Sequence, residues 1–308
     1  MNLSAITISG IISYLNELKP RYLKKFRETI YGPYLMELST ESGDIIIIFS
    51  LDDGVFLPTS YLLKQGKSKG FVLDLKRRIE KRRIEKIEQI DLERVICFKM
   101  GERGQQVKLY LELFGKGNIV LTDPLDKILM VKRSLKTKDR EIIPGKKYKL
   151  PPLRGFSLKE VNVRTLINVA GNEDKAASFL IKRLSIDKYV VLEALHRMKI
   201  DPETPFINIK ENLSEIIEKI KELAEIAEKR TEGIFMVYKN DSPAQLLLFN
   251  PSYTDERVKK LVDLTIAGDE YVREVIKRTE LERKKEFMRK KAVSYTHLTL
   301  PNELDGVD

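Results

Sequence analysis

Cysteine, histidine and tryptophan are nearly absent from this sequence, and their scarcity excludes several kinds of site. The 308 residues include one cysteine, two histidines and no tryptophan. One cysteine cannot form an intramolecular disulfide, and Cys97 lies in an apolar run that favours a buried, inert thiol. His196 and His297, far apart in the chain, favour neither a catalytic triad nor a zinc site. We therefore expect no metal, no cofactor and no enzymatic activity.

Long apolar runs and phosphate-binding glycine loops are also missing. The longest wholly apolar run covers residues 45–49, whereas a membrane-spanning helix needs about 20 apolar residues. Residues 1–10 lack the basic and then apolar pattern of a secretory signal. Together with the single cysteine, these features predict a cytoplasmic protein with no membrane partner.

The sequence does contain localised basic charge. Its net charge is +10, and residues 76–86 (net +5) and 132–149 (net +6) account for all of it. Such localisation is typical of proteins that bind a phosphate backbone, although a solvated surface with scattered lysines is the alternative. The candidate phosphate-binding residues are Lys76, Arg77, Arg78, Arg82, Arg83, Lys132, Arg133, Lys136, Lys138, Lys146 and Lys147.

Hydrophobic periodicity changes twice along the chain. A helix is predicted over residues 4–18 and a basic helix over 71–81. Strands are predicted over residues 34–38, 45–49, 55–57, 84–90, 94–100, 107–114, 119–122 and 128–133. Helices follow over residues 157–170, 173–184, 186–198 and from 212 onward, with a capping box between Ser157 and Glu160. Short strands at 233–238 and 245–249 then precede a long polar helix from about 269 to 291.

This order predicts an α+β fold with a β-sandwich-like lobe and a helix-hairpin-helix module. The long polar helix resembles the start of a coiled coil, which would need a partner helix and would allow self-association. The final residues break the helical pattern and are typical of a tail foreign to the fold. The predicted segments are a β-rich lobe (1–152), a helix-hairpin-helix module (153–205), a returning helix with strands (206–268), a coiled-coil start (269–292) and the tail (293–308).

Two stretches closely resemble the N-terminal domain of the NFACT family, which includes the NEMF and RqcH group. They are residues 88–95, EQIDLERV, and residues 109–123, LYLELFGKGNIVLTD. Weaker similarity covers the basic helix after Gly70, the Pro144-Gly145 turn and residues 267–271, AGDEY. The resemblance covers residues 4–292 in order and implies the N-terminal half of such a protein. The implied fold is similar to that of formamidopyrimidine DNA glycosylases.

The resemblance implies a non-enzymatic ribosome-associated quality control factor. Family members bind the large ribosomal subunit, with its rRNA, when it carries stalled peptidyl-tRNA. They recruit charged tRNA, most often alanyl-tRNA, for C-terminal tailing of the nascent chain. The family's acidic-arginine pair falls on Glu93 and Arg94, and an arginine fork suits a phosphate or a tRNA end. A salt bridge within a strand is the alternative for this pair. The glycine loop of the resemblance contains Gly115, Gly117 and Asn118; on spacing alone it is a tight hairpin.

One position departs from the family pattern. Members commonly carry an Asp in the N-terminal helix, where this chain has Thr7, the third candidate tRNA-binding residue. This substitution bears on tRNA selection and tailing rather than on ribosome binding. Two other functions are the alternatives: a nucleic-acid-processing enzyme of glycosylase-like fold, and an adhesion or interaction protein. The start Met1-Asn2 lacks the N-terminal proline of the glycosylases, and the missing signal and disulfides weigh against adhesion.

Overall fold

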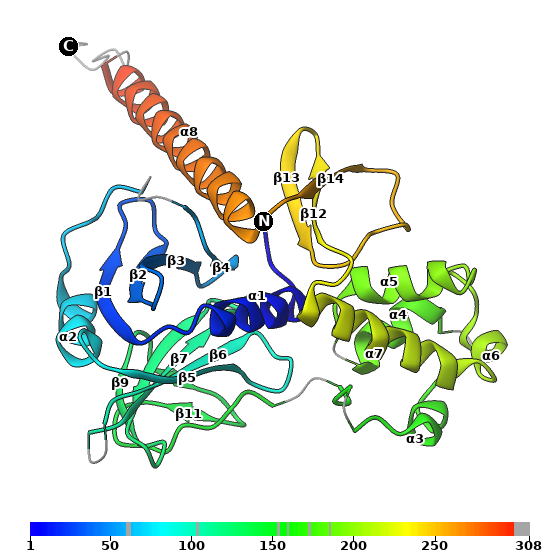
Figure 1. Cartoon of the computed structure of the whole chain (residues 1–308). Coiled ribbons are helices and arrows are strands. Elements are labelled where there is room, and N and C mark those ends of the chain that lie inside the picture. The colour runs from blue at the N-terminus through cyan, green and yellow to red at the C-terminus, as the bar shows by residue number, and fades with distance from the viewer. Residues whose placement is uncertain are drawn as a thin grey trace, which may run out of the picture.

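The computed structural model describes residues 1–59, 63–102, 105–152, 155–158, 160–171, 174–184 and 186–298, with side chains as far as Lys290. Figure 1 shows a β lobe and a helical module on opposite sides of helix α1 (Ala5–Glu17), and a long helix that projects from the body. Ser4 caps the start of helix α1, because its hydroxyl accepts a hydrogen bond from the Thr7 amide at 3.0 Å. The predicted first helix is confirmed.

Two antiparallel sheets form the β lobe. The first has the order β1-β2-β3-β4, and the second has the order β5-β6-β7-β8-β9. The strands of the first are β1 (Tyr22–Glu28), β2 (Tyr34–Ser39), β3 (Asp44–Ser50) and β4 (Gly54–Phe56). Those of the second are β5 (Ile84–Gln89), β6 (Val95–Met100), β7 (Val107–Glu112), β8 (Asn118–Thr122) and β9 (Ile128–Val131). All eight predicted strands of this lobe are confirmed, whereas β1 was not predicted because its polar residues hide the alternation.

The two sheets share one apolar core, consistent with the predicted sandwich-like lobe. Phe49 of β3 and Phe98 of β6 are both fully buried in it. Helix α2 (Gly70–Ile79) confirms the predicted basic helix and packs on β1, with Leu75 fully buried in the core. The Leu23 amide of β1 donates to the Arg82 carbonyl at 3.0 Å. This bond joins the edge strand of the first sheet to the segment that leads into β5 of the second sheet. A two-stranded ribbon, β10 (Leu135–Lys136) with β11 (Glu141–Ile142), extends the lobe.

Four short helices form the helical module: α3 (Val163–Asn168), α4 (Ala176–Leu184), α5 (Lys188–Arg197) and α6 (Phe206–Ile209). The prediction of a helix over 157–170 is wrong in its bounds. Ser157 and Glu160 form a turn, and α3 begins only after Asn162, whose side chain accepts from the Arg164 amide at 2.9 Å. Helix α6 packs on α4 through the rings of Phe206 and Phe179, so the module continues past residue 205. Its helix-hairpin-helix character stays a prediction.

The chain returns from this module through helix α7 (Leu213–Lys229), which packs along α1. A three-stranded antiparallel sheet follows, with β12 (Ile234–Lys239) between β13 (Ser242–Leu247) and β14 (Arg257–Leu261). Helix α8 (Leu264–Leu298) starts five residues before its predicted beginning, and its backbone continues seven residues beyond the predicted end at about 291. None of the helices in the described part of the chain is long and apolar enough to cross a membrane.

The first turns of α8 are fastened to the β lobe. Asp269 accepts hydrogen bonds from the Thr59 amide at 2.9 Å and the Thr59 hydroxyl at 2.6 Å. The Tyr271 ring stacks on Phe56 with 3.7 Å between centroids. Gly268 permits this approach, because a methyl group there would lie 2.5 Å from the carbonyl carbon of Leu57.

We expect Gly268→Ala to weaken this attachment. The added methyl group meets backbone atoms that cannot rotate away, and overpacking of this kind costs about 1–3 kcal/mol. The gain in helix propensity, about 1 kcal/mol, offsets part of the cost. The net loss is then up to about 2 kcal/mol, and thermal unfolding should show Tm lowered by up to about 8 °C. Gly171→Ala is the control, because the nearest neighbour of a methyl group there is a side-chain oxygen at an ordinary 3.4 Å. Equal Tm values for the two variants would contradict the close approach.

Candidate nucleic-acid interface

A strained hairpin turn carries Glu93 and Arg94. It connects β5 to β6, and the Glu93 amide closes it by donating to the Ile90 carbonyl at 2.8 Å. Its central residues, Asp91 (φ +47°) and Leu92 (φ +54°), are both left-handed. That conformation costs about 1–2 kcal/mol for a residue with a Cβ, and leucine is an unusual occupant. Such strain tends to collect at functional sites.

Arg94 lies half-buried where the β lobe meets the helical module. Its Nη2 donates to the carbonyl oxygens of Asp52 at 2.9 Å and Asp53 at 3.4 Å. Its Nε is buried and has no hydrogen-bond partner. Burial lowers the pKa of Arg94, while the carboxylates of Asp53 and Asp187 act in the opposite direction. Arg94 is therefore held by the backbone of the β3–β4 turn.

Asp187 is the acidic neighbour of Arg94 on the module side. It caps α5 by accepting a hydrogen bond from the Tyr189 amide at 2.8 Å. Burial raises its pKa to about 6, although this cap bond and the charge of Arg94 both favour the carboxylate. The Asp187 carboxylate, which faces Arg94 between the lobe and the module, therefore gains a proton in mildly acidic solution.

Thr7 has its hydroxyl committed inside the protein. This oxygen donates to the Leu246 carbonyl at 2.9 Å and accepts from the Ser4 hydroxyl at 2.9 Å, and the residue is buried. It therefore links the start of α1 to β13 and offers no free group to a ligand in this structure. Its predicted tRNA contact stays a prediction.

The glycine loop between β7 and β8 packs against the first sheet. A Cβ on Gly117, which has φ +58°, would lie 2.3 Å from the Cβ of Leu51, so only glycine fits there. Gly115 also has positive φ but has open space around it. The buried Asn118 side chain donates to the Arg133 carbonyl and accepts from the Arg133 amide, at 2.9 and 3.0 Å. These contacts favour the tight-hairpin interpretation over a binding loop.

The first basic segment surrounds the end of α2. Arg78 and Arg83 are exposed, and Arg77 lies 3.5 Å from Asp74 at the surface. Lys76 lies 3.9 Å from Glu80. Arg82 donates to the carbonyl oxygens of its neighbours Arg78 and Gln105. Most of this segment can therefore face a polyanion, but Arg82 is used within the protein.

The second basic segment divides in the same way. The Nζ of Lys132 lies over the Tyr34 ring, 4.9 Å from its centroid, and Arg133 donates to the Gly117 carbonyl. Both serve the β lobe itself. The remaining four predicted residues are exposed lysines around the β10–β11 ribbon, and only weak contacts to Glu141 engage two of them. They are Lys136, Lys138, Lys146 and Lys147.

The structure does not bring the first basic segment and the Glu93–Arg94 pair together. Arg83 directly precedes β5, whereas Glu93 follows it, so they lie at opposite ends of that strand. In Figure 1, α2 and β9 occupy the side of the lobe remote from the module, and the β5–β6 end faces α1 and the module. A single ligand would have to be large to touch both.

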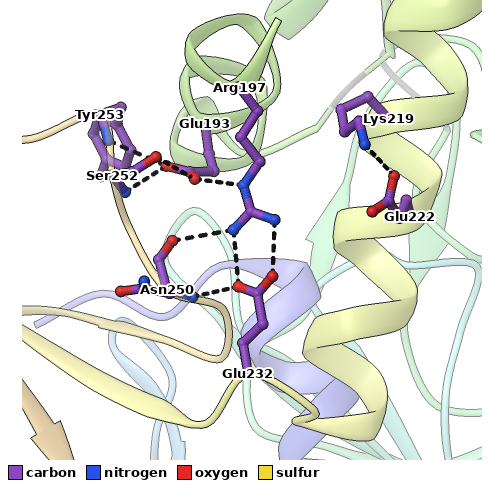
Figure 2. Close-up of polar contacts among 8 residues, drawn as sticks. All are labelled: Glu193, Arg197, Lys219, Glu222, Glu232, Asn250, Ser252 and Tyr253. Carbon is purple, nitrogen blue, oxygen red and sulfur yellow. Dashed lines mark hydrogen bonds and ion pairs between the residues drawn. The ribbon is translucent and has the colours of Figure 1, made fainter.

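An ionic cluster between α5 and the segments around the last sheet was not predicted from the sequence (Figure 2). Glu193 is fully buried and accepts from Arg197 Nε at 2.6 Å and from the Ser252 amide at 2.8 Å. Arg197 also forms a two-pronged pair with Glu232, both bonds at 2.8 Å. The bond from Arg197 lowers the pKa of Glu232. This cluster joins α5 to the segments beside β12 and β13. The four-residue spacing of Glu193 and Arg197 was the only visible signal.

Metal binding has no support in the described residues. Among them, no group of three or more histidine, cysteine, aspartate or glutamate side chains is placed to hold an ion. Cys97 is buried, and burial raises its pKa to about 12, so it is a poor nucleophile.

Comparison with known proteins then decides the family. The model for the NFACT N-terminal and middle domains matches residues 63–299. This chain belongs to the NFACT family. It is 30% identical over 225 residues to the archaeal Rqc2 homolog aRqcH of Methanocaldococcus jannaschii, covering 70% of the chain and 31% of that relative. It is 37% identical over 93 residues to the Rqc2 homolog RqcH of Bacillus subtilis, covering 27% and 16%. This NFACT chain therefore spans about a third or less of the length of these relatives.

Two solved structures share the fold of this NFACT chain. The fibrinogen binding protein from Staphylococcus aureus superposes with a TM-score of 0.70 at 17% identity, covering 87% of this chain and 98% of that one. The N-terminal part of the fibronectin/fibrinogen-binding protein from Streptococcus suis gives 0.67 at 16% identity, covering 88% and 98%. At such identities the likeness establishes the shared fold alone.

Asp187→Asn should remove a pH dependence from the stability of this NFACT chain. With a folded pKa of about 6, Asp187 keeps a proton that the unfolded chain has released, so stability falls as pH rises from about 4 to 6. Asparagine keeps the helix cap but does not titrate. We expect the Tm of the variant, relative to the parent, to rise by about 2–5 °C across that window. The control is Asp201→Asn, an exposed carboxylate of the same module; the same trend there would contradict the assignment.

Proposed function

We propose that this chain is the RNA-binding N-terminal part of a ribosome-associated quality control factor. Such a factor binds the large ribosomal subunit that carries stalled peptidyl-tRNA and recruits charged tRNA, with alanyl-tRNA the first candidate, for tailing of the nascent chain. The match of residues 63–299 to the NFACT domains carries the proposal. The names of the relatives support it, since they include an Rqc2 homolog and a ribosome quality control complex subunit NEMF homolog of Drosophila melanogaster.

The geometry supports an RNA ligand through two separate surfaces. Exposed lysines around the β10–β11 ribbon and arginines at the end of α2 supply positive charge without base selectivity. Arg94 supplies a guanidinium whose position is fixed by two backbone carbonyls. Because the arginines at the end of α2 and Arg94 lie at opposite ends of β5, they fit an extended polyanion such as tRNA or rRNA better than a small ligand. A binding role without catalysis accounts for both.

Sedimentation with purified large subunits tests this proposal. Binding should weaken steeply between 50 and 200 mM salt, because released counterions accompany each phosphate that the protein neutralises. Alanine at Lys136, Lys138, Lys146 and Lys147 should reduce the salt slope by about 0.7–0.9 for each phosphate that is no longer neutralised. The control carries the same charge change at Lys210, Lys219, Lys229 and Lys239. Binding by the parent chain that does not change with salt would overturn the proposal, and equal slopes for the two variants would exclude the ribbon.

Arg94→Ala should separate binding from folding. Removal of a charge-assisted hydrogen bond to RNA costs about 1.5–3 kcal/mol, which is roughly a 10- to 150-fold weaker tRNA affinity. The missing bonds to Asp52 and Asp53 should lower Tm by only about 2–4 °C. Arg257→Ala removes the same charge from an exposed arginine paired with Asp241 and should leave affinity nearly unchanged. If Arg94→Ala lowers Tm strongly while affinity holds, Arg94 serves the fold only.

A further inference from the structure

One side chain ties the strained hairpin turn to the start of α1. Gln89 is the last residue of β5, and its side-chain nitrogen Nε2 donates to the Ala5 carbonyl at 2.7 Å and to the Glu93 carbonyl at 2.9 Å. Ala5 lies in the first turn of α1, and Glu93 follows the left-handed pair. Gln89 therefore uses both of its amide protons to join two segments that are distant in the sequence.

The turn needs such a restraint. Asp91 is exposed, so its left-handed conformation receives little support from packing. Leu92 is partly buried against the core beside α1 and contributes some of that support. Backbone bonds from Glu93 to Ile90 and from Ile90 to Val95 close the turn. The Gln89 side chain adds a restraint from outside it, because it holds the Glu93 carbonyl directly before Arg94. A turn released from this contact would relax toward ordinary φ values and would carry Glu93 and Arg94 with it.

Helix α1, to which Gln89 is bonded, is itself held firmly in the protein. Asn16, near the end of α1, donates to the Ile87 carbonyl of β5 at 2.9 Å, so a second amide binds the same helix to the same strand. At the start of α1, Thr7 holds the helix to β13 through the Leu246 carbonyl. Helix α1 thus gives Gln89 a fixed reference, and the position of the turn is set against the body of the protein.

We propose that Gln89 is a positioning residue for RNA binding, acting through Glu93 and Arg94. This inference rests on the proposed function, because it assumes that Arg94 contacts RNA. Gln89 sets the position of the Arg94 guanidinium. Removal of the Gln89 side-chain bonds should therefore weaken tRNA binding only through Arg94.

The test is a double-mutant cycle on tRNA binding at low salt. Gln89→Leu keeps the size of the side chain and removes the donor. It should weaken tRNA binding about three- to ten-fold in the parent and have almost no effect in the Arg94→Ala background, as expected for coupled residues. The accompanying fall in Tm should be the same in both backgrounds. A residue that only stabilises the fold would reduce affinity equally in both.

Gln106→Leu is the matched control. Gln106 also donates through its side-chain nitrogen, to both oxygens of Glu85 at 3.0 and 3.1 Å, but at the exposed remote end of β5. Its replacement should leave tRNA affinity unchanged. Amide hydrogen exchange gives a second readout that needs no ligand: Gln89→Leu should speed exchange of the Glu93 amide, which closes the turn, without affecting the β6–β7 ladder.

Each outcome has a distinct meaning. Unchanged affinity, or an equal reduction in the Arg94→Ala background, would overturn the positioning role while leaving the proposed function intact. Unchanged exchange of the Glu93 amide would overturn it independently of any binding measurement. Failure of the parent chain to bind tRNA or large subunits would be visible before any variant is compared, and it would refute the proposed function.

Discussion

The β3–β4 turn at Asp53 is the point on which the arrangement of the molecule depends. Its backbone carbonyl accepts from the Leu3 amide at 2.6 Å and from Arg94 at 3.4 Å. Its carboxylate accepts from the Tyr271 hydroxyl at 3.0 Å and from Arg278 at 3.4 Å. The start of the chain, the candidate RNA contact and the long helix therefore meet at one residue. A buried carboxylate is tolerated only where such partners offset its lost hydration.

Buried charge recurs at the other junctions of the fold. Glu112 binds Arg140 and the Tyr148 hydroxyl beneath the β10–β11 ribbon, and Glu193 with Arg197 joins the module to the last sheet. Each cluster is nearly saturated with hydrogen bonds, so removal of one member would leave an uncompensated charge. In this protein apolar packing builds the sheets and helices, while ionic clusters fix how these parts are placed.

The sequence predicted the elements better than their connections. Alternating apolar residues identified nearly all strands of the lobe, and α1 and α7 followed from helical spacing, because both signals are local. Strands β1 and β14 were not predicted, because lysines and arginines occupy their exposed positions and obscure the apolar alternation. Helix α3 was placed too early because a capping box was visible at Ser157, whereas the effective cap is Asn162.

The candidate site was only partly visible in the sequence. Glu93 and Arg94 came from the family resemblance, and no local pattern shows that Leu92 would be left-handed or that Gln89 would reach Ala5. The basic segments were identified by charge alone, yet Arg82, Lys132 and Arg133 turn inward to carbonyl or phenol oxygens. Burial of a side chain depends on distant strands, so charge runs overstate the available surface.

Helix α8 packs closely on the β lobe at Gly268 and extends beyond it, so it can act as a lever that pivots at its base. At 1.5 Å per residue, the 27 steps from Tyr271 to Leu298 span about 40 Å. A tilt of about 10° at the base would displace the far end of a helix of this length by about 7 Å. Because Asp53 contacts both the base of this lever and Arg94, a force applied at its tip reaches the β3–β4 turn with mechanical advantage. A displacement of the far end of α8 would therefore reach Arg94 through Asp53, without any long-range rearrangement of the sheets.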